Sequence, residues 1–204
     1  MNWMVRSAAV LVALVAAGLG IAYSGVVDAS ARERHWPVIE RLIEWARNRS
    51  IAVHAKDISV PTSFDAHDRV VEGMTHYREH CAVCHGGPGV GPDDMAQGMY
   101  PAPPDLQQAA ARRTPAELFW IIKNGIKMSG MPAWADHGDE ELWPIVALVS
   151  QLPILNPEDY ASLAAEADLT KGGRHAQTRT ALPADGPAGT ETHDHLGHHH
   201  HHDH

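Results

Sequence analysis

The sequence predicts an all-α protein, and three observations carry this prediction. Segments 35–50, 63–85, 114–127 and 139–152 place their apolar residues at the three- and four-residue spacing of an amphipathic helix. The connections between these segments are rich in glycine and proline, which favour loops. No stretch alternates apolar and polar residues with a period of two, the pattern of a half-buried strand.

The N-terminal segment predicts export from the cytoplasm. From Ala8 to Val27 about twenty residues carry no charge, which at about 1.5 Å per residue is enough to cross a hydrocarbon layer of about 30 Å. Arg6 precedes this run and favours a cytoplasmic N-terminus. The alternative is a signal peptide cleaved at the Ala-Ser-Ala of 29–31, but the run exceeds the usual apolar core of about 7–15 residues. We therefore expect a single-pass anchor.

The chain divides into four parts. Residues 1–31 form the anchor or signal, 32–62 a membrane-proximal amphipathic helix and linker, 63–155 the main domain, and 156–204 a tail. The helix in the second part lies either at the membrane or against the main domain, and its pattern does not decide. The tail is rich in Gly, Thr, Ala and Pro and is expected to be disordered. The net charge of −9 argues against a nucleic-acid partner.

The main domain contains the motif CAVCH at 81–85, which holds both cysteines of the chain. In a helical turn, residues i, i+3 and i+4 share a face, so Cys81, Cys84 and His85 project to one side. Two thiols placed in this way can add across the two vinyl groups of a haem, while the imidazole reaches the iron. The motif therefore predicts one covalently attached haem c per chain. Attachment outside the cytoplasm agrees with the predicted export.

Three other uses of the cysteine pair are weaker. A zinc site needs two further ligands, and the chain has no second cysteine pair. A thioredoxin-like redox pair opens a helix after a strand, whereas this pair closes a helix in an all-α chain. A disulfide between residues this close would constrain little of the chain.

The chain resembles class I cytochrome c, in particular the small membrane-anchored monohaem cytochromes of bacteria. The resemblance covers about ninety residues, from Phe64 to Leu152, and implies a class I cytochrome c-like helical domain around the haem. It also implies that a glycine lets the first and last helices of the domain cross closely. The motifs that carry it are Gly73-x-x-x-Tyr77-x-x-x-Cys81, CAVCH at 81–85, PPDL at 103–106 and GIKMSGMPAW at 125–134.

The resemblance places the distal iron ligand at Met131. The residues support this choice less sharply: Met131 lies 46 positions after His85, on a loop between two helices, and can approach the opposite face of the ring. A loop methionine can also simply fill a gap in the core. The competing methionines are Met95, Met99 and Met128.

In similar cytochromes, a backbone carbonyl of a proline-containing loop orients the proximal histidine. The segment YPAPPDL at 100–106 fits this role, with Pro103 as the first choice and Pro101 as the next. Trp134 and Trp120 are candidates for the haem wall or for contacts with the haem propionates, with ordinary core packing as the alternative.

Filled axial positions predict a carrier of single electrons and not an enzyme. Expected partners are redox proteins of the periplasm or inner membrane, such as an oxidase, a reductase or a dehydrogenase. The expected location is the bacterial inner membrane with the haem domain in the periplasm, or the periplasm itself if the N-terminus is cleaved. An open iron would indicate a haem peroxidase or gas sensor instead.

The C-terminus carries a second metal-binding pattern. This pattern is the histidine-rich segment 193–204. A purification tag would also be rich in histidine, but we favour a native site for Cu, Ni or Zn. This supports an alternative function, a metal-handling or metal-sensing protein whose haem domain is coupled to a chelating tail. The tail ligands are His193, His195, His198, His199, His200, His201, His202 and His204.

Overall fold

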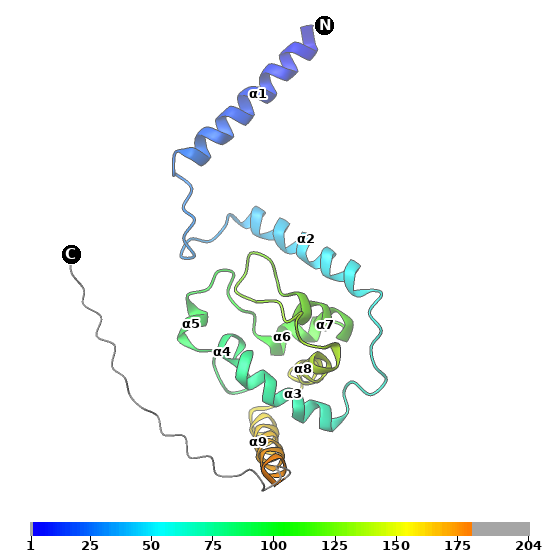
Figure 1. Ribbon diagram of the computed structural model, residues 1–204. Helices are drawn as coiled ribbons and strands as arrows, with labels where there is room; N and C mark the ends of the chain where they lie inside the picture. The colour runs from blue at the N-terminus through cyan, green and yellow to red at the C-terminus, as the bar shows by residue number, and fades with distance from the viewer. Residues whose placement is uncertain (1, 181–204) are drawn as a thin grey trace, which may run out of the picture.

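The computed structural model describes residues 2–180 of the chain (Figure 1). Over this range the elements are helices, and the β-type pairing consists of one isolated bridge between Gly87 and Val90. The predicted all-α class is confirmed. The histidine-rich segment 193–204, with its predicted disorder and metal site, lies outside the described residues.

Helix α1 (Asn2–Tyr23) stands apart from the rest of the molecule (Figure 1). Its stretch from Trp3 to Tyr23 is long and apolar enough to cross a membrane, and none of it is buried. Both a membrane anchor and a signal sequence have this length and composition, so the helix is consistent with either expectation.

Helix α2 (Pro37–Ala55) begins with proline in its first turn, where the missing N–H costs nothing. Its C-terminal half packs against α7 (Pro115–Asn124), and Ile51 and Ala55 are buried there. The helix therefore contacts the main domain, a choice that its sequence pattern left open. The apolar side chains of its N-terminal half are exposed.

The centre of the domain is the crossing of α3 (His67–His80) and α8 (Asp139–Gln151). A Cβ added to Gly73 would lie 2.0 Å from the carbonyl oxygen of Pro144, so the two backbones approach as closely as glycine allows. Trp143 on α8 is buried and stacks on Phe119 of α7, with ring centroids 4.4 Å apart. The expected close crossing at Gly73 is therefore present.

Four short helical segments join these long helices. They are α4 (Ala82–His85), α5 (Asp94–Gln97), α6 (Leu106–Ala109) and the 3-10 turn η1 (Ala110–Arg112). Asp105 accepts a hydrogen bond from the backbone N–H of Gln107 at 2.9 Å and caps α6. Thr114 and Glu117 form a reciprocal capping box that begins α7.

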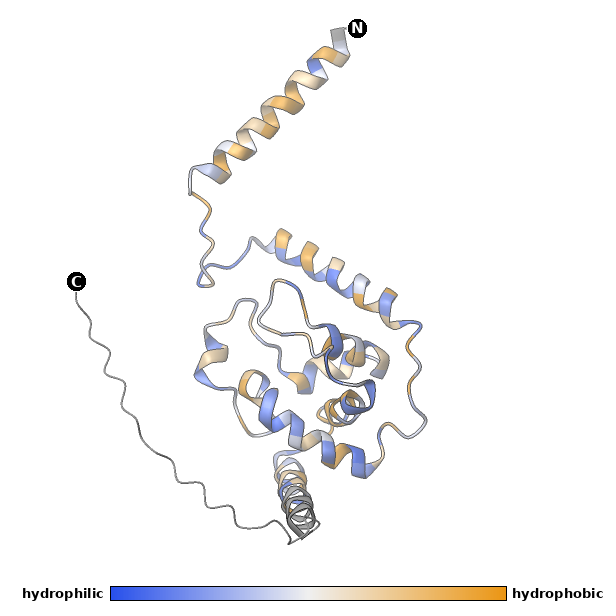
Figure 2. Ribbon diagram, viewed as in Figure 1, coloured by the Kyte–Doolittle hydropathy of each residue, from blue (hydrophilic) through white to orange (hydrophobic). Residues whose placement is uncertain are grey.

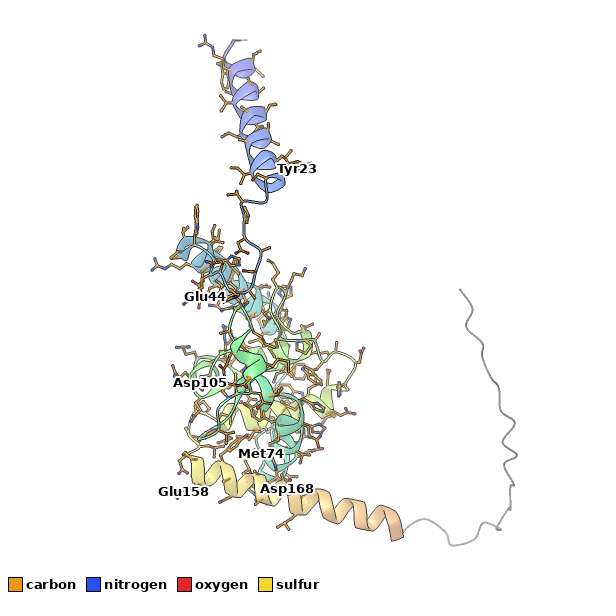
Figure 3. The ribbon with its side chains drawn as sticks, turned by 90° about the vertical axis from the view of Figure 1, so that its left-hand side faces the viewer. Tyr23, Glu44, Met74, Asp105, Glu158 and Asp168 are labelled. Atoms are coloured by element: carbon orange, nitrogen blue, oxygen red, sulfur yellow. The ribbon has the colours of Figure 1, made fainter. Side chains whose placement is uncertain are left out.

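The prediction of disorder from residue 156 was wrong for the first part of the tail. Helix α9 (Pro157–Thr180) packs against α3, and Tyr160, Leu163 and Ala167 are buried. Figure 3 shows α9 running beneath the domain between the labelled Glu158 and Asp168. Asp168 pairs with Arg78 of α3 at 2.9 Å. A few apolar residues on one face suffice to dock this alanine-rich helix, and composition alone does not reveal them.

Candidate haem site

The end of α3 and the short α4 bring the two cysteines and the histidine to one cavity. The backbone N–H of His85 donates to the carbonyl of Cys81 at 3.0 Å, which closes a helical turn across the motif. Cys81 and Cys84 are unpaired and partly buried, and both line a cavity of about 890 Å³ together with His85. The shared face predicted from the spacing is present.

A backbone carbonyl orients the imidazole of His85. Its Nδ1–H donates to the carbonyl oxygen of Pro104 at 2.9 Å, which leaves Nε2 free to bind a metal. The expectation of Pro103 as acceptor was therefore wrong by one residue, although Pro103 also lines the cavity. The direction of each carbonyl depends on the backbone torsions of this loop, which the α6 cap at Asp105 helps to hold and which the proline pattern does not encode.

The loop after α7 places Met131 in the same cavity. Ser129 supports this loop, because its Oγ accepts a hydrogen bond from the N–H of Met131 at 3.2 Å. Of the competing methionines, Met128 is 78% exposed and lines no part of the cavity. Met99 lines it, but its sulfur is packed against the loop, 2.9 Å from the position of a Cβ added to Gly130.

Tyr77 supports the turn that follows the motif. It is fully buried, and its hydroxyl donates to the carbonyl of Gly86 at 2.8 Å. Burial raises the pKa of this phenol, so it stays a neutral donor. The sequence motif that contains Tyr77 did not reveal this hydrogen bond.

The environment of Cys81 disfavours a thiolate. Burial raises the pKa of its thiol to about 11, so the neutral form persists at physiological pH. Zinc ligands and redox-active cysteines act as thiolates. Among residues that the structure describes, no group of three or more His, Cys, Asp and Glu side chains could hold a metal ion. The raised thiol pKa argues against the redox-pair interpretation, and the lack of a third ligand beside the cysteines among the described residues argues against a zinc site.

The two tryptophans suggested for the site lie in different places. Trp134 lines the cavity, and its ring lies 5.1 Å from that of His80. Trp120 does not line the cavity, and its ring lies 5.5 Å from that of His54 on α2. Trp120 therefore packs between helices and does not form a wall of the cavity.

Residues 68–149 match the family model described as cytochrome C oxidase, cbb3-type, subunit III. This range holds the CAVCH motif, the Pro104 carbonyl and Met131. The domain is a class I c-type cytochrome. A comparison with curated proteins found no match. The matched range excludes α2 and all of α9.

The residues of the cytochrome domain fit the covalent haem that the family implies. Two unpaired thiols, one oriented imidazole and the side chain of Met131 line a single cavity. A bound haem supplies an iron that gains and loses one electron. The two thiols and the imidazole of His85 would hold the ring in place.

One wall of the cavity was missed in the sequence. Residues of α2, outside the matched range, line the cavity beside η1 and the start of α7. These residues are Glu44, Arg47, Asn48 and Ile51. Their helical spacing is visible in the sequence, but the sequence does not show that they face the cavity.

Proposed function

We propose that this protein is a membrane-anchored monohaem cytochrome that carries single electrons between redox partners in the periplasm, with His85 and Met131 as axial ligands of the iron. The observation that carries the proposal is that one cavity contains Cys81, Cys84, the oriented imidazole of His85 and the side chain of Met131.

A histidine and a methionine on the iron leave no position open for a substrate. The site then exchanges electrons without bond making, which is the work of a carrier. The family match is named for a subunit of a cytochrome c oxidase, so a terminal oxidase is one candidate partner or assembly. A dehydrogenase or a reductase could exchange single electrons with this site in the same way.

The N-terminal helices support location at the membrane. Helix α1 is long enough to span the hydrocarbon layer, and α2 follows it after a short connection. On the side of α2 turned away from the domain, Val38, Leu42 and Trp45 are exposed at helical spacing. An amphipathic helix of this kind close to a span can lie in the membrane interface.

The ligands can be tested with the optical spectra of the oxidised and reduced protein. We expect a low-spin c-type spectrum with the weak charge-transfer band of methionine-ligated ferric haem. In Met131→Ala this band disappears and the reduced iron binds carbon monoxide. Met128→Ala is the matched control, because Met128 lies three residues away and is exposed, so its spectra should equal those of the wild type. Ready binding of carbon monoxide by the wild type would contradict the carrier and favour a sensor or peroxidase.

A further inference from the structure

In its central turns, helix α2 presents polar side chains to the cavity, while its C-terminal end buries apolar ones. Glu44, Arg47 and Asn48 line the cavity, whereas Leu42 and Trp45 are 58% and 67% exposed. Figure 2 shows the same division, with hydrophobic residues on the side of α2 turned away from the other helices. A surface helix ordinarily buries its apolar side. Polar groups of α2 therefore form part of the cavity wall.

Charge in the cavity is confined to one part of its wall. Of the described residues that line it, the Asp, Glu, Lys and Arg side chains come from three places: α2, η1 with the residue that follows it, and the first turn of α7. They are Glu44, Arg47, Arg112, Arg113 and Glu117. The remaining wall, including the neighbourhood of the two cysteines, carries no such side chain. The excess of arginine over glutamate makes this part of the wall positive.

Hydrogen bonds connect α2 to this cluster. Arg113 donates to the side-chain oxygen of Asn48, across 65 positions of sequence, and lies 3.7 Å from Glu117. Arg47 lies 3.8 Å from Glu44 on its own helix. Among the residues that the structure describes, no carboxylate pairs with Arg112 within 4.0 Å. The cluster therefore retains capacity to bind an anion.

A haem brings two carboxylates to this cavity. Its vinyl groups and its propionates lie on opposite sides of the macrocycle, so attachment at Cys81 and Cys84 directs the propionates away from α4. We propose that α2 is part of the haem site, and that Arg47 and Asn48, with Arg112 and Arg113, bind the propionate edge. This inference rests on the haem assignment of the proposed function. It extends the site to a helix outside the matched cytochrome domain.

The physical consequence is a bias in the reduction potential. A guanidinium group beside a propionate offsets negative charge close to the iron, and in a partly buried site this effect is poorly screened. Removal of the guanidinium leaves the propionate uncompensated and stabilises the ferric ion, which carries one more positive charge. The reduction potential then falls.

The test compares Arg47→Gln with Arg49→Gln in the full-length, haem-loaded protein. Both variants lose one positive charge from the same helix, but Arg49 is exposed and does not line the cavity. We expect Arg47→Gln to lower the reduction potential, so that the ratio of reduced to oxidised protein at a fixed potential falls several-fold. Arg49→Gln should leave this ratio near the wild-type value.

Equal potentials in Arg47→Gln and Arg49→Gln would overturn the inference. If Arg47→Gln fails to fold, Glu44→Gln replaces it, because Glu44 lines the cavity from the same helix and is exposed, and loss of its negative charge should raise the reduction potential. The optical spectrum distinguishes a failure of the haem assignment from a failure of the role proposed for α2. A chain without a c-type spectrum contradicts the proposed function, whereas a normal spectrum with unchanged potentials contradicts only the role of α2.

Discussion

Gly73 shows how a single residue sets the geometry of the domain. Its Cα faces the backbone of α8 at Pro144, at a distance where no side chain fits. The nearest atoms of α8 belong to its backbone, so no flexible side chain could move aside for a larger residue. The position of α3 on α8 in turn places the CAVCH motif at the cavity.

We predict that Gly73→Ala destabilises the haem-loaded protein. The added Cβ would lie 2.0 Å from a backbone oxygen, so the helices must separate, and overpacking of this kind typically costs about 1–3 kcal/mol. Denaturant unfolding followed by circular dichroism measures the change. The matched control is Gly98→Ala, whose Cβ would meet its nearest neighbour at an ordinary 3.8 Å. Equal free energies of unfolding for the two variants would show that the crossing tolerates a methyl group.

His85 shows what a local motif leaves undetermined. The spacing of CAVCH places the imidazole beside the two thiols, and the structure agrees. The acceptor of its Nδ1–H is the carbonyl of Pro104 and not that of Pro103, because a loop with several prolines offers several carbonyls. Their directions depend on how the loop meets α6 and the rest of the domain.

Among the helices, α9 differs most from what the sequence predicted. Its inward residues contact α3, and the ring of Tyr160 occupies the space beside Gly87, where an added Cβ would lie 2.7 Å from it. Gly87 follows the CAVCH motif by two residues. The helix therefore supports the segment that follows His85, from outside the matched range.

We expect Leu163→Ala to destabilise the protein more than Leu169→Ala. Leu163 is 8% exposed and Leu169 is 79% exposed on the same helix. Truncation of a buried leucine typically costs about 2–5 kcal/mol, because transfer energy is lost and a cavity remains. Thermal unfolding of the two haem-loaded variants gives the comparison. A similar Tm for both would mean that α9 does not pack on the domain in solution.

At the level of the whole molecule, α1 and the cytochrome domain are separate parts joined by residues 24–36. The span has no buried residues, so the domain does not need it for its core. A helix this long and apolar that the protein does not bury is explained by insertion into lipid or by recognition as an export signal.

We predict that the mature protein retains α1 and leaves the membrane only with detergent. Washing of isolated membranes at high pH, followed by detection of the haem domain, measures this retention. The control replaces residues 1–31 by a cleavable signal peptide, and its haem domain should appear in the soluble periplasmic fraction. A mature N-terminus near residue 32 in the unaltered protein would instead identify α1 as a signal peptide.

The sequence by itself determined the helical class, the haem-attachment motif, the methionine loop and the apolar N-terminal helix. Each is a local pattern, in which spacing along one or two turns decides which side chains share a face. Only the tertiary structure decided that Pro104 accepts from His85, that Tyr160 and Leu163 dock α9, and that Arg47 faces the cavity. These features join segments far apart in the chain, as between Asn48 and Arg113, and such contacts depend on how whole helices pack.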